Sequence, residues 1–95
     1  MAVDFKMEPN GDGYFTISEA GKQLADMRVT IDGSTLTAHH TGVIPEAEGR
    51  GLAKELFNAM VDYANLHKLQ VVPLCVFVNA QLRRHPEQYA DIWKK

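Results

Sequence analysis

Hydrophobic and polar residues alternate along the first 41 positions of the chain, and this period of two predicts β-strands. The alternating segments are residues 3–8, 14–18, 23–31 and 35–41. Turn signals containing glycine separate them at Asn10-Gly11-Asp12-Gly13, Ala20-Gly21 and Asp32-Gly33. Strands joined by turns this short pair antiparallel, so we expect a meander of three or four strands.

The pattern changes its period after residue 50. Apolar residues then recur at three and four positions up to His67, which predicts a helix with one buried face. A short apolar run at residues 70–74 predicts a buried strand that joins the sheet through a right-handed parallel crossover. Pro73 suits only a sheet edge or a place where pairing breaks. A short helix to Arg84 is expected after Cys75, and Pro86 can start another turn or two.

These elements predict a single α+β domain over residues 1–95. Its sheet is an antiparallel meander, its main helix crosses to a short parallel strand, and short C-terminal helices complete it.

Composition narrows the function classes. The net charge is −2, so bulk charge gives no support for nucleic-acid binding. No apolar run approaches the ~18 residues of a membrane span, and the N-terminal residues lack the apolar core of a signal peptide. The single cysteine excludes a disulfide framework and a multi-thiolate metal site, and the histidines lack zinc-ligand spacing. We therefore expect a cytoplasmic monomer or weak dimer without a metal, nucleic-acid or membrane partner.

Two glycines open the main helix, as Gly49-x-Gly51. The first N–H groups of a helix have no partner within it and carry partial positive charge, which suits a phosphate group. Glycine permits close approach of such an anion. The same glycines could instead serve only a turn, because glycine commonly marks loops. The spacing lacks the further residues of a dinucleotide fingerprint or a P-loop.

The segments Thr41-Gly42-Val43-Ile44-Pro45 and Gly49-Arg50-Gly51-Leu52-Ala53 resemble motif A of the GNAT acetyltransferase superfamily. In that superfamily a Gln/Arg-x-x-Gly-x-Gly/Ala loop holds the pyrophosphate of coenzyme A with backbone amides. This chain has Glu46 at the first position and so departs from the pattern there, while backbone binding by residues 49–54 is retained. The resemblance implies cofactor contacts from Thr41, Val43, Gly49, Arg50, Gly51, Leu52, Ala53 and Lys54.

Further motifs occur in order along nearly the whole chain: His40-Thr41-x-Val43, Pro73-x-Cys75-x-Phe77 and His85-Pro86-Glu87-x-Tyr89. In this combination the chain resembles the small stand-alone GNAT-like family often called YjdJ-type. That family implies a minimal acetyltransferase fold without the helices that usually lie between the first two strands. In the GNAT fold the fourth and fifth strands splay apart around the pantetheine arm, which here implies that Cys75 lies close to the thioester.

Cys75 and His40 are the candidate catalytic residues. A free cysteine is most often an inert core residue, but the end of a parallel strand commonly opens onto a ligand crevice. Strand alternation places His40 with Leu36 and Ala38, where it could be a hydrogen-bonded core histidine. It could also take a proton from an incoming ammonium group or activate Cys75. The same alternation directs His39 to the opposite face.

The sequence as a whole predicts an N-acetyltransferase that uses acetyl-coenzyme A, with Cys75 at the active site. The acceptor would be a small amine or a lysine-containing molecule. A direct attack by the amine and a route through acetyl-Cys75 both remain open. The alternative is a module that binds coenzyme A or an acyl form of it with little or no catalysis.

Overall fold

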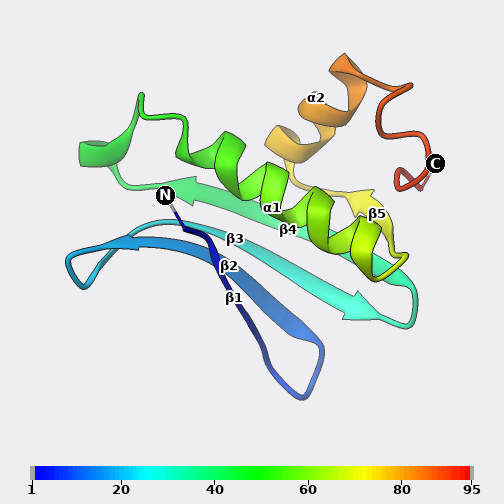
Figure 1. The fold of residues 1–95 in the computed structure, drawn as a ribbon, viewed down its shortest axis with the longest axis horizontal. Coiled ribbons are helices and arrows are strands. Elements are labelled where there is room, and N and C mark those ends of the chain that lie inside the picture. Colours follow the sequence, from blue (N-terminus) through cyan, green and yellow to red (C-terminus); the bar gives the residue numbers. More distant parts are fainter. Residues whose placement is uncertain (1, 95) are drawn as a thin grey trace.

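A computed structural model describes residues 2–94, and its first four strands form the meander that the alternation predicts (Figure 1). The sheet has the order β1-β2-β3-β4-β5, antiparallel except between β4 and β5. The strands are β1 (Asp4–Met7), β2 (Asp12–Glu19), β3 (Lys22–Asp32), β4 (Thr35–Val43) and β5 (Gln70–Pro73). The predicted α+β class is confirmed, because the fifth strand is parallel and follows the main helix.

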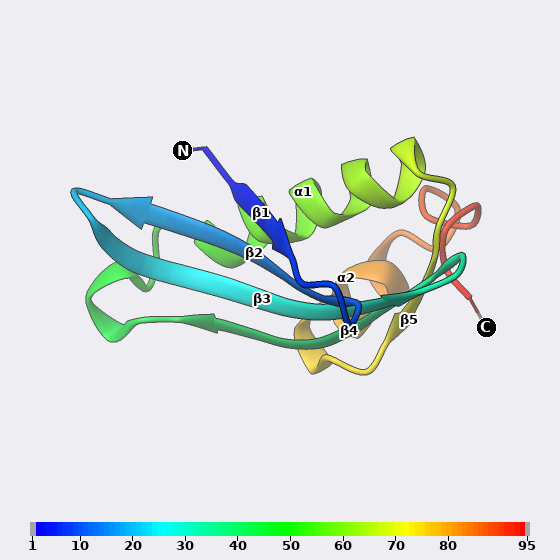
Figure 2. The ribbon, with the colours of Figure 1, turned by 90° about the horizontal axis from the view of Figure 1, so that it is seen from below.

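The main helix, α1 (Leu52–Leu66), covers one face of the sheet and leaves the other face open (Figure 2). The covered face of β2 and β3 contributes Phe15, Ile17, Met27 and Val29 to the core, and α1 contributes Leu52, Leu56, Phe57, Met60 and Ala64. The apolar residues that alternate in the strands and those that recur along the helix thus pack against each other in one core. Within residues 2–94, no helix is both long enough and apolar enough to cross a membrane.

A β-bulge interrupts β4. Arg28 pairs with His40, whereas the next residue of β3, Val29, pairs with Ala38, so His39 is an extra residue without a partner in the register. A bulge of one residue reverses the side to which all following side chains point.

The bulge corrects our assignment of His40 to a face. We expected His40 to share the face of Leu36 and Ala38, which are buried. That prediction is wrong, because His40 lies opposite the exposed Arg28 and is itself exposed. The bulge instead brings Thr41, which pairs with the buried Met27, to the side of the core.

The pairing of β4 with β5 is short. It runs from Thr35 and Gln70 to Ala38 and Pro73, and one further bond joins the N–H of Cys75 to the carbonyl of Ala38 at 2.8 Å. The remainder of β4 continues to Val43 without β5. The predicted separation of the two strands is confirmed, and Pro73 lies where the pairing ends.

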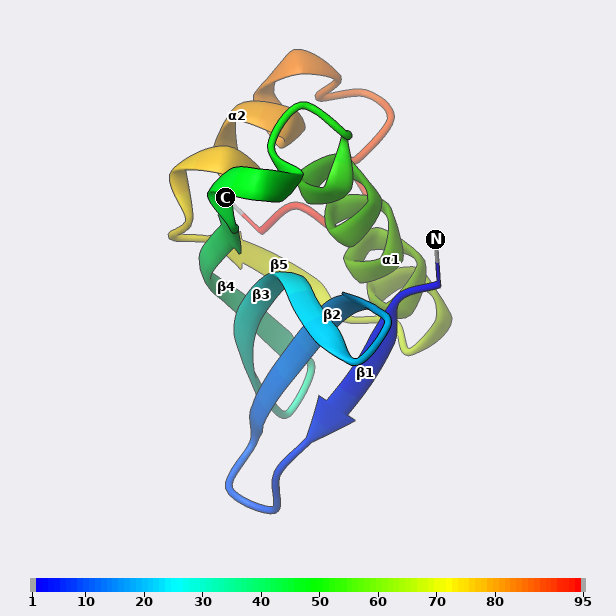
Figure 3. The same cartoon turned by 90° about the vertical axis from the view of Figure 1, so that its left-hand side faces the viewer.

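The C-terminal part covers the outer edge of β5. Helix α2 (Val76–Arg84) begins directly after Cys75, as predicted, and residues 86–92 then form successive turns rather than a second helix. The N–H of Lys94 donates to the carbonyl of Val71 at 2.9 Å, and Ile92 is buried. Figure 3, seen from the end of the sheet, shows the connection with the short helix η1 (Pro45–Ala47) that leads from β4 into α1.

Candidate functional site

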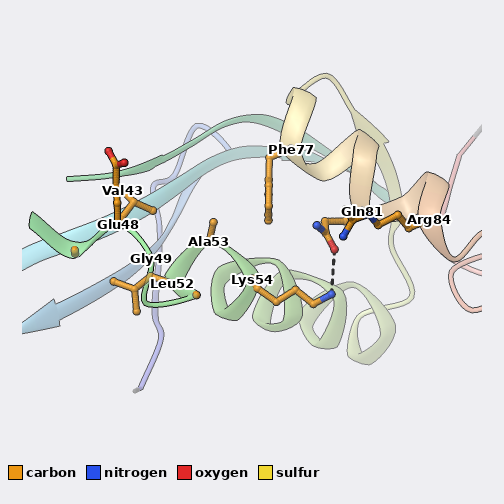
Figure 4. Close-up of a pocket in the computed structure, with 11 residues that line it drawn as sticks. Val43, Glu48, Gly49, Leu52, Ala53, Lys54, Phe77, Gln81 and Arg84 are labelled. Carbon is orange, nitrogen blue, oxygen red and sulfur yellow. Dashed lines mark hydrogen bonds between the residues drawn. The ribbon is translucent and has the colours of Figure 1, made fainter. Parts of the chain in front are cut away.

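A pocket of about 570 Å³ opens where β4 ends, α1 begins and α2 passes (Figure 4). We call it the glycine pocket. Val43 lines it from β4, and the residues between 47 and 54 other than Arg50 line it from the loop and the first turn of α1. The third wall is one face of α2 with Phe77, Gln81 and Arg84. This volume lies within the range of small-molecule sites.

The two glycines of this pocket adopt backbone conformations that favour glycine. Gly49 has a φ of +85° and Gly51 a φ of +76°, in the left-handed region. A Cβ atom built at either position would have no atom within 4 Å. The glycines are therefore required by the turn, and the space in front of them is open to a ligand.

The first turn of α1 faces the same space. The first backbone bond of the helix runs from the N–H of Glu55 to the carbonyl of Gly51 at 3.2 Å. The N–H groups of Leu52, Ala53 and Lys54 precede that bond, and the N-cap residue Gly51 offers them no side chain. Such a terminus attracts an anion through its N–H groups and the helix dipole.

Two cations belong to the pocket walls. The Lys54 ammonium donates to Oε1 of Gln81 at 3.0 Å, which ties α1 to α2 across the pocket (Figure 4). The same ammonium lies 5.7 Å from the centroid of the Phe57 ring. Arg84 lines the pocket from the end of α2. Phosphate groups would thus meet two positive side chains as well as backbone N–H groups.

None of the site residues predicted from the sequence lies on α2. Phe77, Gln81 and Arg84 follow one another at spacings of four and three, which places them on one face of the helix. That spacing was the available signal. It identifies a face, but only the packing of α2 beside α1 shows that this face lines the pocket.

Arg50, which we predicted to contact the cofactor, has its side chain elsewhere. Its Nη2 atom lies 3.2 Å from Oε2 of Glu19 at the end of β2, and Arg50 does not line the glycine pocket. Glu46 occupies the first position of the motif, where the GNAT superfamily has glutamine or arginine. Its carboxylate accepts a hydrogen bond of 2.7 Å from the ammonium of Lys22. That hydrogen bond, with the positive charge of Lys22, lowers the pKa of the Glu46 carboxyl below its ordinary value.

A second pocket of about 620 Å³ surrounds the entrance to Cys75, and we call it the Cys75 pocket. Residues 39–41 of β4 form one wall, and residues 74–77 with Ala80 form the other. The connection from β5 to α2 lies on the side of the sheet away from α1 (Figure 2). Phe77 lines both pockets, so this residue of α2 borders the glycine pocket and the Cys75 pocket alike.

Cys75 itself is only 6% exposed and is the N-cap residue of α2. Its Sγ atom lies 3.3 Å from Oγ1 of Thr41, across the point where the strands separate. Its carbonyl accepts the N–H of Asn79 at 2.9 Å. The thiol is therefore held in one place by backbone bonds on both sides and by one hydroxyl.

The two neighbouring histidines differ in their surroundings. His40 is exposed, and its Nε2 atom lies 3.2 Å from where a Cβ atom of Gly42 would stand. His39 is partly buried, and its Nε2 atom lies 2.9 Å from Oγ1 of Thr30. Both line the Cys75 pocket, so the bulge that changes the face of His40 still leaves it beside Cys75.

The structure thus distributes the candidate residues over two adjoining pockets. Cys75, His40 and Thr41 line the Cys75 pocket, and Val43, Gly49, Gly51, Leu52, Ala53 and Lys54 line the glycine pocket. Nowhere in residues 2–94 do three or more histidine, cysteine or carboxylate side chains gather in an arrangement that could hold a metal ion.

A sequence model of the GCN5-related N-acetyltransferase family matches residues 14–92 of the chain. Among solved structures, a GCN5-like protein from Staphylococcus aureus is 27% identical, with a TM-score of 0.69 over 96% of this chain and 87% of that protein. No curated protein matches in sequence.

Two larger enzymes share the fold at lower identity. The ribosomal-protein-S18-alanine N-acetyltransferase of Escherichia coli is 16% identical with a TM-score of 0.64, over 70% of this chain. The ribosomal-protein-alanine N-acetyltransferase of Brucella melitensis is 17% identical with a TM-score of 0.62, over 90% of this chain. The chain spans 43% of the first enzyme and 63% of the second.

Proposed function

This chain belongs to the GCN5-related N-acetyltransferase family and is an acyltransferase, and from that premise we propose that it moves an acetyl group from acetyl-coenzyme A to an amine. The observation that carries the proposal is that the glycine pocket and the Cys75 pocket share a lining residue, Phe77, just beyond the point where β4 and β5 stop pairing. We further propose that the chain represents the small stand-alone branch of the family. The near-complete mutual coverage with the Staphylococcus aureus protein supports this.

The residues of the glycine pocket fit coenzyme A. The open space before Gly49 and Gly51 and the first N–H groups of α1 suit the pyrophosphate, and Lys54 and Arg84 suit further phosphate charge. The pantetheine arm would extend past Phe77 toward Cys75. When bound, acetyl-coenzyme A would supply an activated acetyl group as its thioester.

The chemistry needs a positioned thioester, a deprotonated amine and a place for the departing proton. In direct transfer, a bond forms between the amine nitrogen and the acetyl carbon, the thioester bond breaks, and coenzyme A leaves as a thiol. We propose that His40, exposed in the Cys75 pocket, takes the proton from the amine directly or through water.

Cys75 offers a second route. A bond forms between its Sγ atom and the acetyl carbon while the thioester bond breaks, and the cysteine proton leaves with the coenzyme A thiol. The amine then takes the acetyl group and its proton restores the Cys75 thiol. The fixed position of Sγ beside Thr41 supports a role for Cys75 at the site in either route.

A binding module is the second candidate, and one feature of the fold favours it. Only the turn of residues 8–11 joins β1 to β2, so no helices cover the open face of the sheet from there. An acceptor would be held by fewer elements than in a larger enzyme. We expect slow turnover on this account, in a cytoplasmic protein that acts as a monomer or weak dimer.

Mass spectrometry of the pure protein after incubation with acetyl-coenzyme A tests the proposal. We expect a non-covalent complex under native conditions. An added acetyl mass in the denatured wild type, absent in Cys75→Ala, would establish the covalent route, whereas amine acetylation without that mass would establish direct transfer. Binding without acetylation of any amine would support the module. Absence of every bound species at millimolar ligand would reject the assignment of coenzyme A.

A variant of His40 separates its role from coenzyme binding. His40→Ala should lower the rate of acetyl transfer while leaving the affinity for coenzyme A unchanged. His67→Ala is the matched control, because His67 lies at the end of α1 with its ring 4.2 Å from that of Tyr63 and lines neither pocket. Equal rates in His40→Ala and the wild type would remove His40 from the proposal.

A further inference from the structure

Exposed apolar side chains line the Cys75 pocket beside Cys75. Four large apolar side chains are exposed within residues 2–94, and two of them, Leu74 at 63% and Val76 at 84%, lie in this pocket on either side of Cys75. Phe77 and Ala80 add further apolar surface to the same wall. Exposed apolar side chains that cluster at the mouth of a pocket typically mark a binding surface.

The pocket contains no carboxylate. Its other lining residues are His39, His40, Thr41 and Cys75. The nearest acid by register is Asp26, which pairs with Gly42 and lines two other depressions. A Cβ atom at Gly42 would lie 3.4 Å from its Oδ1 atom and 3.2 Å from Nε2 of His40, so this one carboxylate lies near the His40 side of the pocket. An acceptor with one ammonium group could pair with Asp26, whereas a polyamine or a lysine-rich peptide would find no carboxylate among the lining residues to compensate its further ammonium groups.

We infer that the Cys75 pocket receives a primary amine with one amino group and an apolar body, either aliphatic or aromatic. The amino group lies beside Cys75 and His40. The apolar body packs on Leu74, Val76 and Phe77, where burial of its surface from water stabilises the complex.

This inference rests on the proposed function, because it takes the Cys75 pocket as the acceptor side of the acetyl transfer. The lining residue that the two pockets share supports that premise. Phe77 is the shared wall, so an amine in the Cys75 pocket and a thioester reaching past Phe77 from the glycine pocket would meet at the strand separation.

Direct binding tests the inference without acetyl transfer. The full chain, labelled with ¹⁵N, is titrated with 2-phenylethylamine, hexylamine, spermidine and a lysine-rich peptide in separate NMR experiments. We expect the two apolar amines to shift the backbone signals of Thr41 and of residues 74–77, and spermidine and the peptide to leave them in place. Tighter binding of spermidine or the peptide at these residues would overturn the inference.

Variants of the apolar wall sharpen the test. Val76→Ser should weaken the binding of 2-phenylethylamine roughly tenfold, since it removes exposed apolar surface from the site. Leu66→Ser is the matched control, because Leu66 is 77% exposed at the end of α1 and lines neither pocket. Leu74→Ser repeats the test on the other side of Cys75. Equal affinity in Val76→Ser, Leu74→Ser and wild type would overturn the inference.

Two further measurements separate the possible failures. If coenzyme A binds but the apolar amines do not, the inference fails while the proposed function stands. If the apolar amines bind at residues 74–77 but coenzyme A does not bind, the proposed function fails and the pocket assignment stands. Sedimentation of the wild type and Val76→Ser identifies a third case: a dimer that dissociates in the variant would make the apolar wall a contact between two copies, which overturns the inference.

Discussion

The Sγ atom of Cys75 and the Oγ1 atom of Thr41 lie 3.3 Å apart and bridge β4 and the start of α2 where the strands stop pairing. Thr41 reaches this position because the bulge at His39 brings it to the side of the core. A hydroxyl at this distance can donate to the sulfur as the sulfur gains negative charge. The contact therefore couples the reactivity of Cys75 to one residue on the neighbouring strand.

We predict that Thr41→Val slows the reaction of Cys75 with a thiol reagent about fivefold, the effect of losing one hydrogen bond of ordinary strength. The valine side chain has nearly the shape of threonine, so the fold should persist. Thr37→Val is the control, since Thr37 lies on the same strand and outside the Cys75 pocket. An unchanged rate in Thr41→Val would show that the hydroxyl does not act on the sulfur.

Substitutions of the glycines distinguish a turn from a phosphate site. Gly49→Ala and Gly51→Ala should each destabilise the fold by about 1 kcal/mol, because alanine is strained at a positive φ. Each should also weaken coenzyme A binding, since the added methyl group enters the open space of the glycine pocket. Urea unfolding and calorimetric titration with coenzyme A measure the two effects.

Gly33→Ala is the matched control for the glycine variants. Gly33 has a φ of +60° in the turn between β3 and β4, and a Cβ atom there would also have no neighbour within 4 Å. Its substitution should give a similar loss of stability and an unchanged affinity. If all three variants bind coenzyme A as the wild type does, Gly49 and Gly51 serve only the turn.

The fold could be predicted from the sequence because its local patterns are strong. Residues at the alternating apolar positions of the strands, such as Met27, are buried. So are residues at the apolar positions of α1 that recur every three and four residues, such as Phe57. His40 shows the limit of this approach. A period of two extends through the bulge in the sequence, and nothing local marks His39 as the extra residue, so each later side chain was assigned to the wrong face.

The candidate site was predicted in part, for a related reason. The segment from Gly49 to Lys54 is continuous in sequence, and its helix-start pattern identifies it locally. The wall from α2 depends on packing between distant elements, which a single sequence does not reveal. The ion pair of the Arg50 side chain with Glu19 could not be predicted for the same reason, because Glu19 is 31 positions away, and the cofactor contact of Arg50 stays a prediction.

The ion pair between Lys22 and Glu46 gives a prediction about pH. Lys22 lowers the pKa of Glu46 in the folded chain, mainly through the hydrogen bond of 2.7 Å. The pair therefore stabilises the fold at pH values above the pKa that Glu46 has in the unfolded chain. This stability is lost as the pH falls through the lower pKa that Glu46 has in the folded chain. The gain should be small, because both side chains are largely exposed.

Carboxyl ¹³C NMR signals across a pH titration check this prediction. Lys22→Gln should raise the pKa of Glu46 toward its ordinary value, since both the hydrogen bond and the positive charge are removed. Lys6→Gln is the control, because Lys6 pairs with Glu8 on the far edge of the sheet. The same Glu46 titration in Lys22→Gln and the wild type would contradict the assigned cause.

The adjacent residues Arg83 and Arg84 offer the sharpest test of the cations in the glycine pocket. Arg84 lines the pocket, whereas the Nε atom of Arg83 donates to Oδ1 of Asn79 at 2.8 Å and Arg83 lies outside the pocket. We predict that Arg84→Gln weakens coenzyme A binding about tenfold, the typical effect of losing a charged hydrogen bond to phosphate. Arg83→Gln should leave the affinity unchanged.

Lys54→Gln should weaken binding to a similar extent, and it also removes the donor that Lys54 provides to Gln81. Titrations with 3′-dephospho-coenzyme A then assign the phosphate that each cation meets. Substitution of a residue that contacts the 3′-phosphate should leave the affinity for the dephosphorylated ligand unchanged. Substitution of a residue that contacts the pyrophosphate should weaken the binding of both ligands equally. Equal weakening by Arg83→Gln and Arg84→Gln would instead indicate a general effect of surface charge, because the two variants lose the same charge and differ only in which side chain lines the pocket.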